Sequence, residues 1–280
     1  MRGLLILLRL PFILIWLVSS LASVATIYSM ASLHGRDRMN RAWSSMLVRL
    51  CGVKVKVIGK HHPQGSALWV ANHVSWLDIF ILAGIRSVMF IAKSEIRGWP
   101  VVGWLVAKVG TVFLQRGQRH SLKKVGDEMQ LRFARGEVLG LFAEGTTSTG
   151  FDVLPFHSSL FDPAIRAQVD IQPVALRFYH HGQRSDFASF VGDETLVGNL
   201  WTLLGATGVS VEVEFLPVLT AQQCQEMGRA RVCQQVQQAI AAAVRLAPAP
   251  ESATAAHATG TADTALDDAV CDDTVTVNRL

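Results

Sequence analysis

A long apolar stretch lies near the N-terminus of the chain. From Leu10 to Leu33, 24 consecutive residues carry no charge. As a helix they would extend about 36 Å, which exceeds the bilayer hydrocarbon core of about 30 Å. Because its second half is rich in serine, we expect a helix that either spans the bilayer or anchors the chain at a shallow depth. A cleavable signal peptide is the alternative, since Arg2 and Arg9 precede the stretch and Ser23-Val24-Ala25 could serve as a cleavage site.

The next segment has apolar residues on one side and arginines on the other. The apolar positions are spaced as on one face of a helix: Met39, Trp43, Met46, Leu47 and Leu50. The opposing positions are Arg36, Arg38, Arg41 and Arg49. This pattern predicts an amphipathic helix in the headgroup layer of a membrane. The arginines also favour a cytoplasmic location for the rest of the chain, which in a bacterium means the inner membrane.

Beyond residue 50, short apolar runs alternate with helical spacing. The predicted strands are 53–57, 67–71, 138–142, 171–178 and 211–216. The predicted helices are 77–83, 101–109, 122–133 and a closing helix that begins near Thr220 and ends near Leu246. This alternation predicts an α/β fold with a mixed central sheet flanked by helices. We therefore divide the chain into an anchoring segment (1–50), a globular α/β domain (51–246) and a tail (247–280).

Charge separates the tail from the rest of the chain. Residues 247–280 contain six acids and one base, a net charge of −5, and since the whole chain carries +4, residues 1–246 carry +9. A body this basic is attracted to an anionic lipid surface or a polyanionic substrate. Nucleic acid is a less suitable partner, because no basic run is interleaved with aromatic residues. The tail lacks hydrophobic periodicity and is predicted to be disordered.

Composition and missing motifs exclude several classes of function. Half of the residues are hydrophobic, 17% are charged and the mean hydropathy is +0.31, which suits a membrane-attached globular protein. The four cysteines form no CxxC pair, so neither a disulfide scaffold nor a zinc ribbon is indicated. The sequence contains no nucleophile elbow, P-loop or dinucleotide-binding glycine motif. The pairs His61-His62 and His180-His181 are interpreted as surface histidines, and Trp99 and Trp104 as packing residues or the lining of an acyl groove.

The strongest chemical signal is the segment 72–78, Asn-His-Val-Ser-Trp-Leu-Asp, where a predicted strand gives way to a helix. Sites in α/β proteins form at such strand ends. A histidine paired with a carboxylate acts as a general base whose tautomer the carboxylate fixes, which makes His73 and Asp78 candidates. The alternative is purely structural, because Ser75 and Asp78 also match a helix-capping pattern.

Two further segments could bind a polar ligand. Residues 142–150 form a strand followed by a turn of small and hydroxyl residues, in which Glu144 could hold a hydroxyl group. An ordinary turn is the structural alternative. Residues 110–116 end a strand-like run at Arg116, which could bind a phosphate with two hydrogen bonds or simply lie solvated at the surface.

Together and in this order, these segments resemble the glycerolipid acyltransferases that esterify lysophosphatidic acid and related lysolipids. The resemblance covers about residues 43–219. It comprises an NHxSxxD block at 72–78, a GxxFxxR block at 110–116, an FPEGTRS-like block at 142–148 and a proline-containing strand at 171–174. Two positions depart from the family pattern: Ala143 replaces a proline, and Thr147 replaces an arginine that helps to hold the acceptor phosphate.

The resemblance implies a membrane-bound acyltransferase of phospholipid biosynthesis. A fatty acyl group would pass from acyl-CoA or acyl carrier protein to the free hydroxyl of a lysolipid, with no cofactor and no metal. His73 would be the base, oriented by Asp78. The residues expected to bind substrate are Asn72, Ser75, Arg116, Glu144, Gly145 and Thr146. Lysophosphatidic acid is the expected acceptor, and because of Thr147 a lyso-ornithine lipid or another lysolipid is the alternative.

Two other functions suit the same residues. A non-catalytic lipid-binding or scaffold protein could use the same groove, although the intact His73 and Asp78 pair argues against it. A thioesterase would use water in place of the acceptor, and it would release thiol without any stimulation by lysolipid.

Overall fold

The computed structural model describes residues 2–61, 65–99, 101–115 and 119–246. Its N-terminal part is helical: α1 (Arg2–Ser23) continues through the π-helical turn η1 (Val24–Tyr28), and α2 (Leu33–Leu50) follows after a short turn. Within the described residues, Arg2–Tyr28 is the one helix long and apolar enough to cross a membrane. Helix α2 begins where the Ser32 hydroxyl accepts a hydrogen bond from the Gly35 amide, a standard N-cap.

An eight-stranded sheet forms the centre of the described chain. Its strands are β1 (Lys54–Ile58), β2 (Ala67–Ala71), β3 (Val88–Lys93), β4 (Val112–Leu114), β5 (Val138–Phe142), β6 (Asp170–His180), β7 (Gln183–Arg184) and β8 (Val209–Phe215). Their order is β1-β8-β6-β2-β5-β3-β4, with β7 paired to β6. Neighbouring strands run parallel, except that β8 and β7 each pair antiparallel to β6. The predicted mixed sheet is confirmed.

The remaining helices connect or cover the strands. They are α3 (Leu77–Ile85), η2 (Ser94–Gly98), α4 (Val102–Lys108), α5 (Arg119–Ala134), η3 (Ser158–Leu160), α6 (Asp162–Arg166), α7 (Leu196–Leu204) and α8 (Ala221–Arg245). The predicted closing helix α8 begins with a capping box formed by Thr220 and Gln223, and Gly228 interrupts the helix with a positive φ of 73°. The pattern did not predict β3 or α7, although the apolar run at 88–92 was a usable signal for β3.

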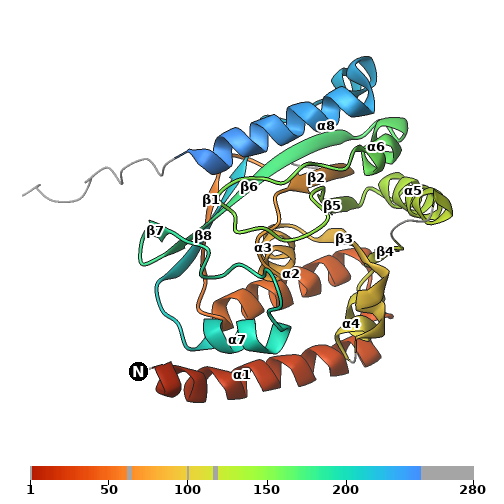
Figure 1. Ribbon diagram of the computed structural model, residues 1–280. Coiled ribbons are helices and arrows are strands. Elements are labelled where there is room, and N and C mark those ends of the chain that lie inside the picture. The colour runs from red at the N-terminus through yellow and green to blue at the C-terminus, as the bar shows by residue number, and fades with distance from the viewer. Residues whose placement is uncertain (1, 62–64, 100, 116–118, 247–280) are drawn as a thin grey trace, which may run out of the picture. The chain divides into compact units, whose positions relative to one another are not determined.

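Two hydrophobic cores lie on opposite faces of the sheet, because side chains along a strand alternate between faces. On β2, Trp69 belongs to the core shared with α2, α3 and α7, whereas Leu68 and Val70 belong to the core shared with α5 and α8. Figure 1 shows α5, α6 and α8 above the sheet and α1, α2, α3 and α7 below it. Since β2 is buried on both faces, its end is held firmly between two helical layers.

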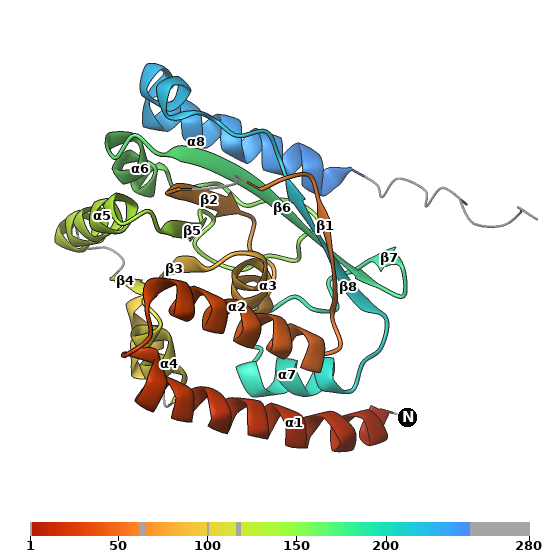
Figure 2. The ribbon, with the colours of Figure 1, turned by 180° about the vertical axis from the view of Figure 1, so that it is seen from behind.

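The N-terminal helices share a core with the rest of the unit. Ile6, Ile13 and Leu47 pack in the same cluster as Trp69, and Figure 2 shows α1 lying along α2 and α7. The Arg9 guanidinium donates to the carbonyl of Ala206 at 2.7 Å. Helix α2 packs against α3, and on its apolar face Leu47 lies in the core and Leu50 packs against it, whereas Met46 is 48% exposed. The expectation that the whole apolar face lies in the headgroup layer is therefore wrong.

Side-chain burial describes the surroundings of two cysteines, two tryptophans and one histidine. Cys51 and Cys224 are buried, and burial raises the pKa of their thiols to about 12 and about 11, so neither is a reactive nucleophile. Trp99 and Trp104 are each 41% exposed, so neither is a core residue, and their role as packing residues or as the lining of an acyl groove stays a prediction. His61 is half-buried, and its ring lies 5.6 Å from that of Phe215.

Candidate active site

The candidate site lies where β2 and β5 end side by side. These strands are parallel neighbours with Ala71 opposite Phe142, so the residues that follow them meet at the same edge of the sheet. His73 follows β2, and Glu144 follows β5. The two sequence segments, 71 residues apart, are joined by a hydrogen bond from the His73 amide to Glu144 Oε1 at 2.7 Å.

Asp78, in the first turn of helix α3, orients the His73 ring and also holds the loop that precedes the helix. Its Oδ2 lies 2.9 Å from His73 Nδ1, and it accepts hydrogen bonds from the amides of Val74 at 2.7 Å and Ser75 at 2.9 Å. The catalytic and structural interpretations of the motif are therefore compatible, because one carboxylate oxygen makes both sets of contacts. Asp78 is fully buried, so the geometry of this pair is shielded from water.

A stack of aromatic rings fixes the plane of the imidazole. The His73 ring lies 4.0 Å from that of Phe142 with an interplanar angle of 11°, and Phe142 stacks in turn on Phe90 at 5.3 Å. Gly140 makes room for this stack, because a Cβ at that position would lie 2.4 Å from the Phe90 ring. No local pattern marks Phe90 or Gly140 as part of the site, because the two residues meet only through the pairing of β3 with β5.

Both carboxylate oxygens of Glu144 accept hydrogen bonds from backbone amides. Its Oε1 accepts from the His73 amide and its Oε2 accepts from the Leu154 amide at 2.9 Å. Burial raises the pKa of the Glu144 carboxyl, while the two amide hydrogen bonds oppose that shift. The side chain thus ties the loop after β5 to the loop after β2.

The backbone carbonyl of His73 accepts hydrogen bonds from the turn of hydroxyl residues at 146–149. The amide of Ser148 donates to the His73 carbonyl at 2.8 Å, and the Ser148 hydroxyl donates to the same oxygen at 3.3 Å. The Thr147 hydroxyl donates to the Phe190 carbonyl, and the Phe190 amide donates to the Val74 carbonyl at 2.8 Å. Segment 185–195 is therefore attached directly to the loop that carries the histidine.

This arrangement suits proton transfer at one ring nitrogen. Nδ1 is occupied by Asp78, whereas Nε2 has no protein hydrogen-bond partner among the described residues. The His73 side chain is 17% exposed, so the ring is accessible from solvent although its partner is buried. No group of three or more His, Cys, Asp or Glu residues in the described ranges could hold a metal ion.

Comparison with known proteins places the chain in a family. The family model described as "Acyltransferase" matches residues 54–177. The lyso-ornithine lipid O-acyltransferase of Pseudomonas aeruginosa is 36% identical over 215 residues, covering 77% of this chain and 81% of that protein. The chain belongs to the acyltransferase family.

Other relatives agree with this assignment. The 1-acyl-sn-glycerol-3-phosphate acyltransferase of Neisseria gonorrhoeae is 36% identical over 176 residues, covering 62% of this chain and 68% of that protein. The crystal structure of PlsC, the 1-acyl-sn-glycerophosphate acyltransferase of Thermotoga maritima, has the same fold, with a TM-score of 0.66 and 21% identity over 87% of this chain and 96% of that one. The predicted family and fold class are confirmed.

The other predicted substrate-binding residues differ in how far they are buried. Asn72 is buried, and its amide group pairs with the Leu176 backbone at 2.7 Å and 3.0 Å, which extends the contact between β2 and β6. Ser75 is buried beside Asp78, Gly145 turns the chain with a φ of 70°, and Thr146 is exposed. Arg116 lies outside the described residues. The substrate-binding roles remain predictions.

Replacing Glu144 by Gln should weaken both the fold and turnover. A glutamine side chain at this position would retain one acceptor, so either the His73 or the Leu154 amide would lose its partner, at a cost of about 1–3 kcal/mol. We expect Glu144→Gln to lower the free energy of unfolding by that amount in denaturant titrations and to reduce kcat. The exposed Glu226→Gln on α8 is the control, and equal stability of the two variants would contradict this assignment.

Proposed function

We propose that this acyltransferase moves a fatty acyl group from a thioester donor, acyl-CoA or acyl carrier protein, to the free hydroxyl of a lysolipid. The observation that carries the proposal is the contact between His73 Nδ1 and the buried Asp78 carboxylate, which leaves Nε2 for a substrate proton. Relatives named for two different lysolipid acceptors support the acceptor class. No cofactor is required, because the thioester supplies the reactive acyl carbonyl.

The proposed reaction proceeds by direct transfer. Nε2 of His73 removes the proton from the acceptor hydroxyl as its oxygen attacks the thioester carbonyl, and Asp78 stabilises the imidazolium that forms. When the tetrahedral intermediate collapses, the carbon–sulfur bond breaks and the proton passes from Nε2 to the departing sulfur. The ring stack with Phe142 holds the imidazole plane during both transfers.

Thr147 favours a lyso-ornithine lipid over lysophosphatidic acid as the acceptor. An arginine at this position would offer a phosphate two hydrogen bonds, whereas Thr147 uses its hydroxyl on the Phe190 carbonyl. Three of the relatives that are 34–37% identical over 193 residues or more are named lyso-ornithine lipid O-acyltransferases. Lysophosphatidic acid remains the second candidate, supported by the neisserial relatives.

We also propose that α1 binds the acyltransferase to the membrane. Its outward side chains are apolar and exposed, and they include Leu4, Leu7, Leu8, Phe12, Leu14, Ile15 and Val18. The neighbouring α7 adds exposed Val197 and Trp201. A contiguous apolar surface of this kind is typical of a membrane contact. The cytoplasmic face of a bacterial inner membrane, which the arginines of α2 favour, is part of this proposal.

Removal of the base should abolish transfer while the fold persists. His73→Ala should lower kcat by about 10² to 10⁴, the usual contribution of a positioned general base. Asp78→Asn should cost no more than this, because Asp78 orients the ring. The measurement is lysolipid-dependent thiol release with labelled acyl donor. Near-normal turnover by folded His73→Ala would refute the mechanism, and thiol release without lysolipid would indicate a thioesterase.

Thr147→Arg should change acceptor preference. Because one Arg–phosphate contact is worth about 1.5–3 kcal/mol, the variant should gain about tenfold or more in relative kcat/KM for lysophosphatidic acid over lyso-ornithine lipid. Thr147→Val removes the same hydroxyl without adding charge, so it isolates the effect of the cation. A wild-type preference for lysophosphatidic acid would overturn the choice of acceptor and leave the catalytic assignment intact.

A polar residue on the exposed face of α1 should weaken membrane binding. Phe12 is 57% exposed, and burying a phenylalanine side chain in an apolar phase is worth about 1.5–3 kcal/mol. Phe12→Asn should therefore lower vesicle partitioning about tenfold or more in a sedimentation assay. The control is Leu131→Asn on α5, which is 47% exposed on the opposite side of the sheet. Equal losses in the two variants would exclude α1 as the membrane contact.

A further inference from the structure

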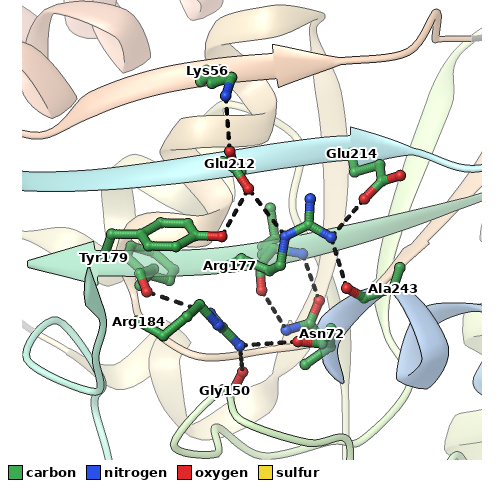
Figure 3. Close-up of polar contacts among 12 residues, drawn as sticks. Lys56, Asn72, Gly150, Arg177, Tyr179, Arg184, Glu212, Glu214 and Ala243 are labelled. Carbon is green, nitrogen blue, oxygen red and sulfur yellow. Dashed lines mark hydrogen bonds and ion pairs between the residues drawn. The ribbon is translucent and has the colours of Figure 1, made fainter. Parts of the chain in front are cut away.

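A polar cluster joins the outer strands of the sheet to the end of helix α8. Arg177 on β6 is almost fully buried, and it donates to Glu214 at 2.6 Å, to Glu212 at 3.2 Å and to the carbonyl of Ala243 at 2.7 Å. Figure 3 shows Arg184 beside this cluster, directed toward the loop that contains Gly150. The proposed mechanism uses neither arginine.

Arg184 contacts three separate parts of the backbone. Its Nη2 donates to the Gly150 carbonyl at 2.6 Å and to the Val244 carbonyl of α8 at 3.2 Å. Its Nη1 donates to the Phe178 carbonyl of β6 at 3.3 Å. The guanidinium also lies 5.6 Å from each of the rings of Phe151 and Tyr179. A planar group held by three carbonyls and two rings has little freedom to move.

Gly150 lies against the loop after β2 that carries His73 and Val74. A Cβ at Gly150 would lie 2.8 Å from Val74 Cγ2, so the turn packs directly on the residue after His73. The Gly150 amide donates to the Ser148 hydroxyl at 3.3 Å, and Ser148 is the residue that holds the His73 carbonyl. The path from Arg184 to the His73 backbone is therefore short and continuous.

We propose that Arg184 is a positioning residue for His73, which it holds in place by fixing the turn at 148–150 against sheet and helix. This inference rests on the proposed function of His73 as the base. Arg177 does not have this role, because its contacts stay within β6, β8 and α8. Removing Arg184 would free the turn and widen the range of His73 orientations, which lowers the rate of the proton transfer.

The chain supplies a matched control on the same loop. Arg245 of α8 forms an ion pair with Asp152 at 2.8 Å, two residues beyond Gly150, and both side chains are more than half exposed. This pair also links α8 to the loop, but it does so from solvent and away from Val74. Exposed ion pairs of this kind contribute little to stability.

The test compares Arg184→Met, Arg184→Lys and Arg245→Met in the full-length chain with lysolipid and labelled acyl donor. Arg184→Met should lower kcat about tenfold or more with KM for the lysolipid changed less than about twofold. Arg184→Lys should recover part of kcat, because a lysine offers one donor to Gly150. Arg245→Met should keep kcat within about twofold of the wild type.

A double variant distinguishes positioning from a general structural defect. In the His73→Ala background, Arg184→Met should lower the residual rate no further, since its effect passes through His73. Equal losses in both backgrounds, an unchanged kcat or an effect confined to KM would each overturn the proposal. If Arg184→Met does not fold, the same comparison is made with Arg184→Lys. The proposed function fails separately, if His73→Ala alone retains turnover.

Discussion

The backbone of His73 is held from both sides, and the rest of the site depends on this constraint. Glu144 accepts the amide hydrogen, Ser148 donates to the carbonyl, and Asp78 and Phe142 fix the ring. Asp78 lies on α3, and the other three partners lie at or after the end of β5. The position of the imidazole therefore depends on how these two segments pack beside the end of β2. An imidazole held this firmly would be ready for the proposed proton transfer before substrate arrives.

This arrangement places two carboxyl groups in the interior, where a charged group loses its hydration. Asp78 is fully buried and Glu144 nearly so, and each would be unfavourable in the interior without hydrogen bonds to its charge. The amides of Val74 and Ser75 donate to Asp78 Oδ2, whereas the buried Oδ1 has no hydrogen-bond partner among the described residues. The amides of His73 and Leu154 donate to the two oxygens of Glu144. The same backbone amides that stabilise the charges also orient the loops, so stability and proposed catalysis share one set of contacts.

The N-terminal helices connect the proposed membrane surface to the catalytic unit. Arg9 holds α1 to the end of α7, and α2 packs against α3, the helix that carries Asp78. The apolar helix packs on the folded unit, because Ile6 and Ile13 belong to the same core cluster as Trp69.

The sequence by itself determined the family, the mixed α/β fold, five of the strands (β1, β2, β5, β6 and β8) and the candidate pair His73 and Asp78, because each depends on local patterns or on spacings of a few residues. Helix α2 was also predicted, but not the surface that it covers, since an apolar helix face suits a membrane and a protein core equally. Only the tertiary structure decided that Glu144 and Ser148 hold His73, that Phe90 needs Gly140 beside it and that Arg184 reaches Gly150. These contacts join residues far apart in the chain, and they depend on which strands become neighbours, a choice that no local pattern encodes.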